Sequence, residues 1–501
     1  MAQVSRRDFL RTAGVTAGVA VAAGYSPFSY AANSKVRVGK IGTGAQGLMR
    51  NLNMGLMLTE DIEVIAVCDV YEPHLRRGQG SVGGENVSAY YDYREMLDKE
   101  ELDAVVISTS QHQHYQPVMD ALDAGKYVFC EKTLTYDIQE SRNIVEKCHE
   151  TGLFCQVGHQ RRYNPQYLKA VWLAREQAML GRIHHMSAHW HQNLRNGWRR
   201  PIDPNYELNE YERQFITDLD RHLNWRLYKD ISGGLVTEFA THQVDIWNWF
   251  LGTMPKRVWG SGNVDYWRDG REVADNIVLV YEYEVRTGDP GFVDMDTRIP
   301  EQDFAQINRP YEVRANYSCL TANAQGSVQE FIRGDEATFQ LSEPWAGGCY
   351  ILGEPDLRDR SEARGWRDGD GETDASTDSE SSPRTQSSRD EDAEAIADAV
   401  TEGESPTIPP GAYREPFPIE VVHDYASPIH YQFAAMAKCI KEGGKPYSNE
   451  MVGHLATVTA LCGLEAIRER KVVEIDPALF TFDFETPDPY QYEYWPDPEH
   501  A

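Results

Sequence analysis

The sequence is poor in positive charge. It contains 49 lysine and arginine residues against 78 aspartate and glutamate residues, which gives a formal net charge of −29. A surface this acidic repels phosphate backbones and anionic lipids, so nucleic acid is excluded as an expected partner and so is an anionic membrane. A carbohydrate is a better candidate ligand.

Cysteine is scarce and shows no metal-binding spacing. The chain has eight cysteines and no Cys-x-x-Cys pair. Cys68, Cys130 and Cys155 lie in apolar, strand-like runs, where thiols act as small hydrophobic groups. We therefore expect neither a disulfide framework nor a zinc ribbon.

No apolar run is long enough to cross a bilayer. The longest, Thr12 to Gly24, has about 13 residues, whereas a transmembrane helix needs about 20. The run follows SRRDFL at residues 5–10 and precedes SYA at residues 29–31. This order is typical of a twin-arginine signal peptide, with paired arginines, an apolar core and small residues before the cleavage site.

We therefore expect residues 1–34 to be a signal peptide and linker that is cleaved after Ala31. The twin-arginine translocon would then be a transient partner. The mature chain would be periplasmic or secreted, without stable membrane insertion.

Short apolar strands alternate with helical stretches in residues 35–160. The strand-like runs are VRVGKIG, EVIAVCD, AVVISTS, KYVFCEK and LFCQVGH. Such alternation predicts an α/β, Rossmann-type domain with a doubly wound parallel sheet.

The pattern of apolar and polar residues changes in residues 161–355 and 411–501. Longer alternating segments, such as HHMSAHWHQN, NIVLVYEYEV and YEVRANYSCL, predict an α+β domain with a large, mostly antiparallel open sheet. An uncovered sheet face of this size favours a homo-oligomer. Two helical stretches near the C-terminus are expected to pack back on the first domain.

Between these parts, residues 356–410 are rich in acidic and small polar residues and have almost no apolar anchors. They cannot bury enough surface to offset the entropy of ordering, so we expect a disordered acidic insert.

A glycine-rich turn follows the first predicted strand and opens a helix. It consists of Gly42, Thr43, Gly44, Ala45, Gln46 and Gly47. Asp69 ends the next strand, where an acidic residue accepts hydrogen bonds from the adenosine ribose of a dinucleotide. The arrangement predicts NAD or NADP binding. Asp69 favours NAD, but Arg76 and Arg77 leave a 2′-phosphate possible.

Four segments resemble the glucose-fructose oxidoreductase, inositol dehydrogenase and MocA (Gfo/Idh/MocA) family. They are ISTSQHQHYQPVMDALDAGKYVFCEKTL, GHQRRYNPQY, WRLYKDISGG and GGLVTEFATHQVDIWNWFLG. The resemblance implies that the first segment binds cofactor, through Thr109, His112, His114, Glu131 and Lys132. The sequence departs from the family pattern twice, with Thr133 in place of proline and Glu238 in place of aspartate.

The chemistry of hydride transfer suggests roles for three of these residues. Oxidising a carbinol needs a base for the hydroxyl proton and a group that stabilises the developing oxyanion. His242 suits the first role and Lys132 the second. Glu238 lies four residues before His242, so on a regular helix it would share a face with that imidazole and orient it or the substrate.

The stretch HHMSAHWH raises a zinc alternative, because His185, His189 and His191 point to one side of a strand. His185 and His189 would be about 13 Å apart, too far for one ion. We therefore predict no metal and a sugar contact for His189. Arginines and aromatic rings also suit a carbohydrate cleft. The further candidates are Arg161, Arg162, Tyr163, Trp198 and Arg199.

Export of a folded protein explains how a dinucleotide binder could work outside the cytoplasm. The cofactor would be acquired before export, held tightly, and reduced and reoxidised within one catalytic cycle, as the family resemblance also implies. The favoured function is an NAD(P)-dependent sugar oxidoreductase. Two alternatives remain: redox-neutral cleavage of a glycoside through a transient keto sugar, and a secreted sugar-binding protein without activity.

Overall fold

The structure is a computed structural model of the chain. It describes residues 34–194, 197–293, 310–343, 347–353, 416–419, 421 and 427–492. The expected signal segment, residues 1–34, lies outside these ranges except for Ser34, and the acidic segment 356–410 lies outside them completely.

The first sheet is parallel and has six strands in the order β3-β2-β1-β4-β5-β6. The strands are β1 (Val36–Ile41), β2 (Ile62–Cys68), β3 (Ser88–Tyr90), β4 (Ala104–Ile107), β5 (Tyr127–Cys130) and β6 (Cys155–Val157). The central strands are apolar on both faces because helices cover both sides of the sheet. The predicted doubly wound Rossmann fold is confirmed.

Polar caps and glycines set the limits of several helices around this sheet. Asp92 caps α3 and Asp137 caps α5, each by accepting a hydrogen bond from a backbone N–H. Gly152 ends α5 in the left-handed conformation, with a φ of 72°. The helices are α2 (Glu72–Val82), α3 (Tyr93–Lys99), α4 (Tyr115–Asp123) and α5 (Ile138–Thr151).

The second sheet has nine strands in the order β14-β13-β12-β11-β7-β10-β9-β8-β15. Only the β7–β10 pair is parallel among its described pairings. The strands are β7 (Ile183–His191), β8 (Pro255–Asn263), β9 (Asn276–Val285), β10 (Tyr311–Leu320), β11 (Val328–Gly334), β12 (Ala337–Leu341), β13 (Tyr350–Gly353), β14 (Phe417–Pro418) and β15 (Val473–Glu474). Alternating burial along β10 and β11 shows one covered face and one open face. The predicted mostly antiparallel open sheet is confirmed.

Three helices cover the inner face of the second sheet. They are α6 (Pro165–Arg175), α8 (Thr241–Leu251) and α12 (Glu450–Glu469). Every residue of α8 is buried, including Trp247 and Trp249. Its polar side chains, among them Asp245 and Asn248, are therefore buried together with its apolar ones.

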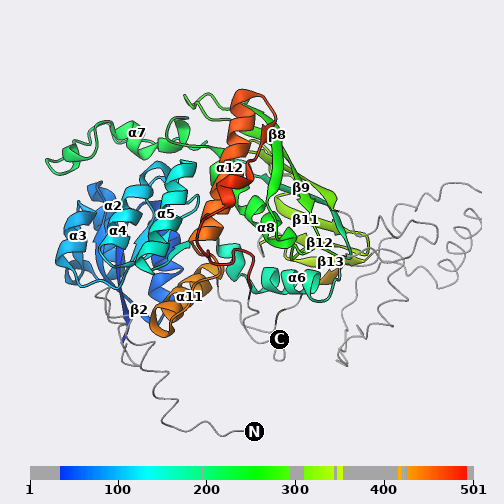
Figure 1. The fold of residues 1–501 in the computed structure, drawn as a ribbon. Coiled ribbons are helices and arrows are strands. Elements are labelled where there is room, and N and C mark those ends of the chain that lie inside the picture. The colour runs from blue at the N-terminus through cyan, green and yellow to red at the C-terminus, as the bar shows by residue number, and fades with distance from the viewer. Residues whose placement is uncertain are drawn as a thin grey trace, which may run out of the picture.

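The two C-terminal helices tie the domains together (Figure 1). Helix α11 (Pro428–Glu442) packs on the first domain, where the rings of Phe433 and Phe129 lie 4.7 Å apart. Helix α12 stands between the two sheets and contacts α5 on one side and β8 on the other. Among the described residues, α12 is the one helix long and apolar enough to span a membrane, and 89% of its apolar window is buried in the protein.

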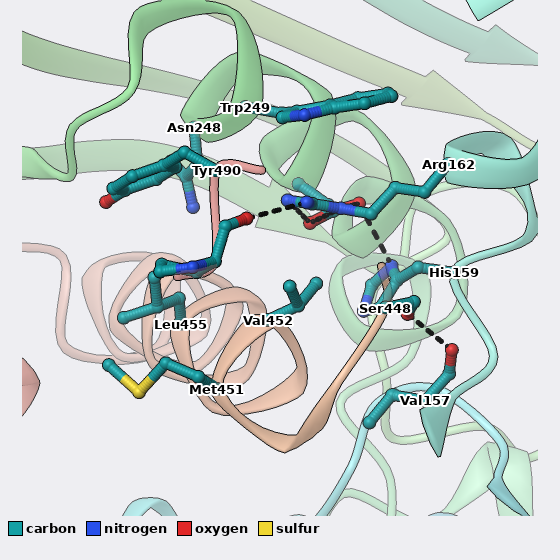
Figure 2. Close-up of polar contacts among 12 residues, drawn as sticks. Val157, His159, Arg162, Asn248, Trp249, Ser448, Met451, Val452, Leu455 and Tyr490 are labelled. Carbon is teal, nitrogen blue, oxygen red and sulfur yellow. Dashed lines mark hydrogen bonds and ion pairs between the residues drawn. The ribbon is translucent and has the colours of Figure 1, made fainter. Parts of the chain in front are cut away.

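A buried ion pair fixes the junction between the domains (Figure 2). Arg162 donates to both oxygens of Asp245 through Nε, at 3.1 and 3.0 Å, and through Nη2 at 2.8 Å. Its Nη1 donates to the carbonyl of Pro489 at 2.7 Å. Next to α12, the Ser448 hydroxyl donates to the carbonyl of Val157 at 2.5 Å. The C-terminal segment is thereby bonded to the end of the first sheet.

His159 at this junction gives stability a pH dependence. Burial lowers its pKa from 6.5 to about 4 although Asp245 lies 3.6 Å away. Below pH 6.5 the unfolded chain binds a proton here and the folded chain does not, so stability is lost as pH falls from 6.5 toward 4. The loss should reach about 3 kcal/mol.

Urea unfolding of wild type and His159→Phe at pH 7.5, 5.5 and 4.5 checks this expectation, because the variant lacks the titrating group. The variant should lose less stability than wild type over this interval. An equal loss of unfolding free energy in both proteins between pH 7.5 and 4.5 would contradict the assignment to His159.

Candidate active site

A cavity of about 700 Å³ lies at the carboxyl ends of the parallel strands and is lined by both domains. Ile41, Asp69, Ser108 and Glu131, which end or follow β1, β2, β4 and β5, all line it. Open α/β sheets bind ligands at this edge. The second domain contributes Arg200, Phe215, His222, Leu223, Trp225, Arg226 and Glu238.

The glycine turn fits a dinucleotide. Gly42 has a φ of +81°, and a Cβ there would lie 2.7 Å from the carbonyl oxygen of Ser108. At Gly47 a Cβ would lie 2.0 Å from the carbonyl oxygen of Gly42, so helix and strand meet too closely for a side chain. At Gly44, which lines the cavity, the nearest protein atom would be 3.5 Å away in the His74 ring. Gly44 therefore leaves space for a ligand rather than for protein.

Asp69 is held rigidly at the cavity wall. Its Oδ2 accepts from the backbone N–H of Thr43 at 2.8 Å, and its Oδ1 accepts from that of Tyr71 at 3.0 Å. The candidates for a 2′-phosphate are engaged elsewhere: Arg76 donates to Glu72, and Arg77 donates to the carbonyl of Pro73. The choice between NAD and NADP stays a prediction.

A buried lysine beneath the glycine turn was missed by sequence reasoning. Lys40 Nζ donates to the carbonyls of Ile41 and Gly42 and to the hydroxyl of Ser108, at 2.9, 2.7 and 2.9 Å. Burial lowers its pKa to about 7, against the opposing influence of nearby Glu131. The sequence signal was a single lysine inside an apolar strand. Lys40 holds the turn from below.

Glu131 and Lys132, which follow β5, form hydrogen bonds to the glycine-turn region on one side and to the second domain on the other. Glu131 Oε1 accepts from Gln46 Nε2 at 2.9 Å and from Asn51 Nδ2 at 3.0 Å. Lys132 Nζ donates to the backbone carbonyl of Glu238 at 2.7 Å. The peptide bond between Lys132 and Thr133, the position where proline was expected from the resemblance, is cis.

The histidine-bearing turn supports this strand end. His114 is buried, and its Nδ1 lies 2.9 Å from the carbonyl oxygen of Thr133 while its Nε2 lies 3.2 Å from that of Thr109. His112 lines the cavity beside Trp225, and burial lowers its pKa to about 4, so its imidazole is neutral at pH 7. Thr109, His112 and His114 all line the cavity, as does Ala45.

Glu238 faces the cavity from the second domain. Its Oε1 accepts from Gln111 Nε2 at 2.8 Å and its Oε2 from Arg226 Nε at 2.9 Å. Burial alone would raise the pKa of Glu238, but Arg226 and Lys132 outweigh burial and hold that pKa below its usual value. The carboxylate is thus charged. Neither Gln111 nor Arg226 was identified from the sequence.

His242 is buried and is not among the residues that line the cavity. Its ring lies 5.7 Å from that of Trp190 and 6.4 Å from that of His159. Burial, reinforced by Lys132 and Arg161, lowers its pKa well below 6.5, so the imidazole is neutral. Its Nδ1 is buried without a protein partner. The catalytic role of His242 stays a prediction.

The helical segment that carries Glu238 and His242 is continuous but not regular. Glu238 lies in a π-helical turn, Val236–Ala240, and His242 lies in α8, which begins after it. The hydrogen bonds of the Glu238 side chain do not include His242, so the predicted orienting role of Glu238 stays a prediction. The carboxylate is bonded to Gln111 and Arg226 instead.

The six residues predicted to contact sugar are not among those lining the cavity. Arg161 is buried in an ion pair with Glu330, and Arg162 is paired with Asp245. A buried guanidinium needs a carboxylate partner, and the sequence pattern did not reveal that both arginines have one.

The other four residues predicted to contact sugar have contacts within the protein. Tyr163 is buried and its hydroxyl accepts from the N–H of Ser448. Arg199 donates to Asp220, and the ring of Trp198 lies near that of Phe239. His189 Nε2 lies 2.9 Å from the carbonyl oxygen of Gly326. Their sugar contacts stay predictions.

In the part of the chain that the structure describes, no three histidine, cysteine or acidic side chains are grouped to hold a metal ion. All eight cysteines are free.

Gly44→Ala provides a test of the cofactor turn that separates binding from folding. A methyl group at this position meets no protein atom closer than 3.5 Å but enters the cavity. The variant should melt within a few degrees of wild type yet bind NADH at least about tenfold more weakly, since the second glycine permits close backbone approach to the pyrophosphate. Fluorescence titration measures the affinity, and Gly80→Ala, which meets nothing within 4 Å, is the control. Unchanged affinity would place the pyrophosphate elsewhere.

Comparison with known proteins agrees with this geometry. The family description "Oxidoreductase family, NAD-binding Rossmann fold" matches residues 36–159, and "GFO/IDH/MocA C-terminal domain" matches residues 173–300. Myo-inositol 2-dehydrogenase of Thermotoga maritima is 26% identical over 263 residues, which are 52% of this chain and 69% of that protein. Inositol 2-dehydrogenase/D-chiro-inositol 3-dehydrogenase of Lactiplantibacillus plantarum is 31% identical over 134 residues, 26% of this chain and 38% of that protein.

Among solved structures, the WlbA dehydrogenase of Bordetella pertussis in complex with NADH and UDP-GlcNAcA superimposes with a TM-score of 0.55. The match is 16% identical and covers 89% of this chain and 99% of that one. At this identity the likeness concerns the fold.

Proposed function

Because this chain belongs to the Gfo/Idh/MocA oxidoreductase family, we propose that it transfers hydride between a sugar or polyol and a tightly bound NAD or NADP. The observation that carries the proposal is the cavity itself. It places the open glycine turn, Asp69, Lys132 and Glu238 around one space between the domains.

Different residues of the chain would bind different parts of the dinucleotide. The turn from Gly42 to Gly47 would hold the pyrophosphate, and Asp69 would accept from the adenosine ribose. Glu131, held by Gln46 and Asn51, fixes the strand end that carries Lys132. The nicotinamide, when bound, supplies the site that accepts or returns a hydride.

Proton handling falls to the residues around Lys132. Its ammonium Nζ has N–H donors beyond the one bonded to Glu238, and these would stabilise the negative charge that develops on the substrate oxygen. A carboxylate with a lowered pKa is a weak base, so Glu238 suits positioning better than proton removal. The neutral imidazole of His242 can accept the hydroxyl proton, provided that substrate or a water reaches it.

Export and cofactor recycling belong to the same proposal. The twin-arginine pattern supports a periplasmic or secreted location, and a protein outside the cytoplasm needs a cofactor that is regenerated in place. Inositol dehydrogenases among the relatives and the sugar nucleotide in the WlbA complex support a carbohydrate or polyol substrate. The open face of the second sheet supports a homo-oligomer.

Absorbance at 340 nm tests the function. We expect denatured, purified protein to release stoichiometric NAD or NADP. The native protein should gain absorbance when an oxidisable sugar or inositol is added and lose it when a carbonyl compound follows. Release of an aglycone without net absorbance change would assign redox-neutral glycoside cleavage instead. Bound sugar without any hydride transfer would leave only a binding protein.

A further inference from the structure

The second domain sends a segment, residues 197–232, across the first domain; we call it the arm. It contains Glu212–Gln214, α7 (Leu219–Leu223) and Trp225–Leu227 as short helical turns. In Figure 1 the part of the arm that carries α7 extends over the first domain, away from the second sheet. None of the sequence motifs assigned above predicted this placement.

A buried carboxylate anchors the arm. Glu212 is fully buried, and its Oε1 accepts from the backbone N–H of Glu72 at 2.9 Å and from the hydroxyl of Tyr206 at 2.6 Å. Glu72 is the first residue of α2, whose N-cap residue Tyr71 makes no side-chain capping bond. A carboxylate is favourable at a helix N-terminus, where free N–H groups and the helix dipole meet it. The arm thus supplies the cap that α2 lacks.

Aromatic contacts extend the anchor on both sides. The rings of Tyr71 and Tyr206 meet edge to face at 5.2 Å, and those of Tyr91 and Tyr211 stack at 5.2 Å with an angle of 11°. Asn209 Nδ2 donates to Glu72 Oε2 at 2.8 Å. The residues of the first domain in these contacts flank Asp69 and the start of α2, the region that meets adenosine in a dinucleotide fold.

Six arm residues line the cavity: Arg200, Phe215, His222, Leu223, Trp225 and Arg226. Asp69 and His74 of the first domain line the same cavity. Asp69 Oδ2 and His74 Nδ1 lie 3.7 Å apart. Asn224 holds Arg200 in place, because its side chain accepts from the Arg200 N–H at 2.6 Å and donates to the Arg200 carbonyl at 3.2 Å. Apolar surface and hydrogen-bond donors therefore face one end of the cavity from the second domain.

We propose that the arm completes the binding site for the adenosine half of the dinucleotide. Arg200, Phe215 and His222 supply cavity wall that the first domain lacks, and Glu212 anchors this wall on α2. The proposal rests on the proposed function only in taking a dinucleotide as the ligand. Because adenosine is then enclosed by both domains, release of the cofactor requires the arm to detach, which makes exchange slow.

The test measures release of two fluorescent ligands, NADH and reduced nicotinamide mononucleotide, which lacks the adenosine half. Each is preloaded on the full-length protein and chased in a stopped-flow instrument. Glu212→Ala should speed NADH release at least about tenfold, since it removes charge-assisted hydrogen bonds, and should leave release of the mononucleotide within twofold. Glu210→Ala, an exposed acid two residues away, is the matched control and should leave both rates unchanged.

His222→Ala is the second variant, because His222 lines the cavity and takes no part in the hydrogen bonds of Glu212 to Glu72 and Tyr206. It should also speed NADH release and spare the mononucleotide, and it decides the matter if Glu212→Ala does not fold. Wild-type NADH release in both variants would overturn the proposal. So would equal acceleration of both ligands, which would mean that the arm supports the whole fold rather than the adenosine end. No sugar takes part, so failure to oxidise any sugar leaves this result intact.

Discussion

Lys132→Met should slow reduction of the bound nicotinamide by about a hundredfold to a thousandfold, the usual cost of removing one donor that stabilises a developing oxyanion. Methionine keeps most of the side-chain volume and removes only the ammonium group. Burial lowers the pKa of Lys132, although Glu238 and Glu131 oppose this, so its environment differs from that of a surface lysine. A single-turnover absorbance trace at 340 nm, with cofactor bound and substrate saturating, measures the step.

Lys99→Met is the control, because Lys99 is exposed, forms an ion pair with Glu95 on α3 and is not among the residues that line the cavity. It should react at the wild-type rate. The bound cofactor should remain stoichiometric in both variants, since the pyrophosphate is assigned to the glycine turn. A Lys132→Met protein that reduces its cofactor at the wild-type rate would remove Lys132 from the chemistry.

The same trace separates the roles of Glu238 and His242. If His242 accepts the hydroxyl proton, His242→Ala should cost about a hundredfold or more. Glu238→Gln should cost less, because the amide can still accept from Arg226 while losing the charge. The reverse order would make Glu238 the base and His242 a buried structural residue.

The parts of this site that could be predicted are those in which one short segment contains the whole signal. The glycine turn, Asp69 and the pair Glu131 and Lys132 each stand at the end of an apolar strand, so local pattern alone places them at one edge of the sheet. Asp69, Glu131 and Lys132 line the cavity, and so do all residues of the glycine turn except Thr43 and Gly47.

The residues missed or misjudged depend on partners distant in sequence. Arg226 lies near the cavity because it pairs with Glu238, and Lys40 is buried because several backbone carbonyls surround its amine. Arg161 was predicted to contact a sugar, but its side chain forms a buried ion pair with Glu330 on β11, a strand far along the chain. Charge pairing in a core is decided by tertiary packing, which periodicity does not encode.

The same distinction applies to the fold. Both sheets were predictable because strand alternation is local, and the strands β7, β9 and β10 coincide with the segments that showed it. The arm was not predictable, because the burial of Glu212 makes sense only beside the N-terminus of α2.

Asp245→Asn should cost about 3–5 kcal/mol of the free energy of unfolding, the usual effect of removing one partner of a buried ion pair. Arg162 would keep its charge in a site where both side chains are almost fully buried, and its remaining acceptors, the new amide oxygen and the carbonyl of Pro489, carry no charge to balance it. Urea unfolding of both proteins at pH 7.5 measures the difference. Asp120→Asn, which breaks the more exposed pair with Arg94, should cost at most about 1 kcal/mol.

The double variant Arg162→Met, Asp245→Leu separates two contributions to the free energy of unfolding. One is the cost of leaving the Arg162 charge unpaired, and the other is the stabilisation by the ion pair itself. Replacing a buried pair with apolar side chains is often neutral, so the double variant should recover most of the stability that Asp245→Asn loses. If it is instead as unstable as the single variant, the pair itself, with its bond to Pro489, stabilises the junction of the domains. Equal stability of Asp245→Asn and wild type would contradict both readings, since it would mean that Arg162 finds another partner or water once the carboxylate is gone.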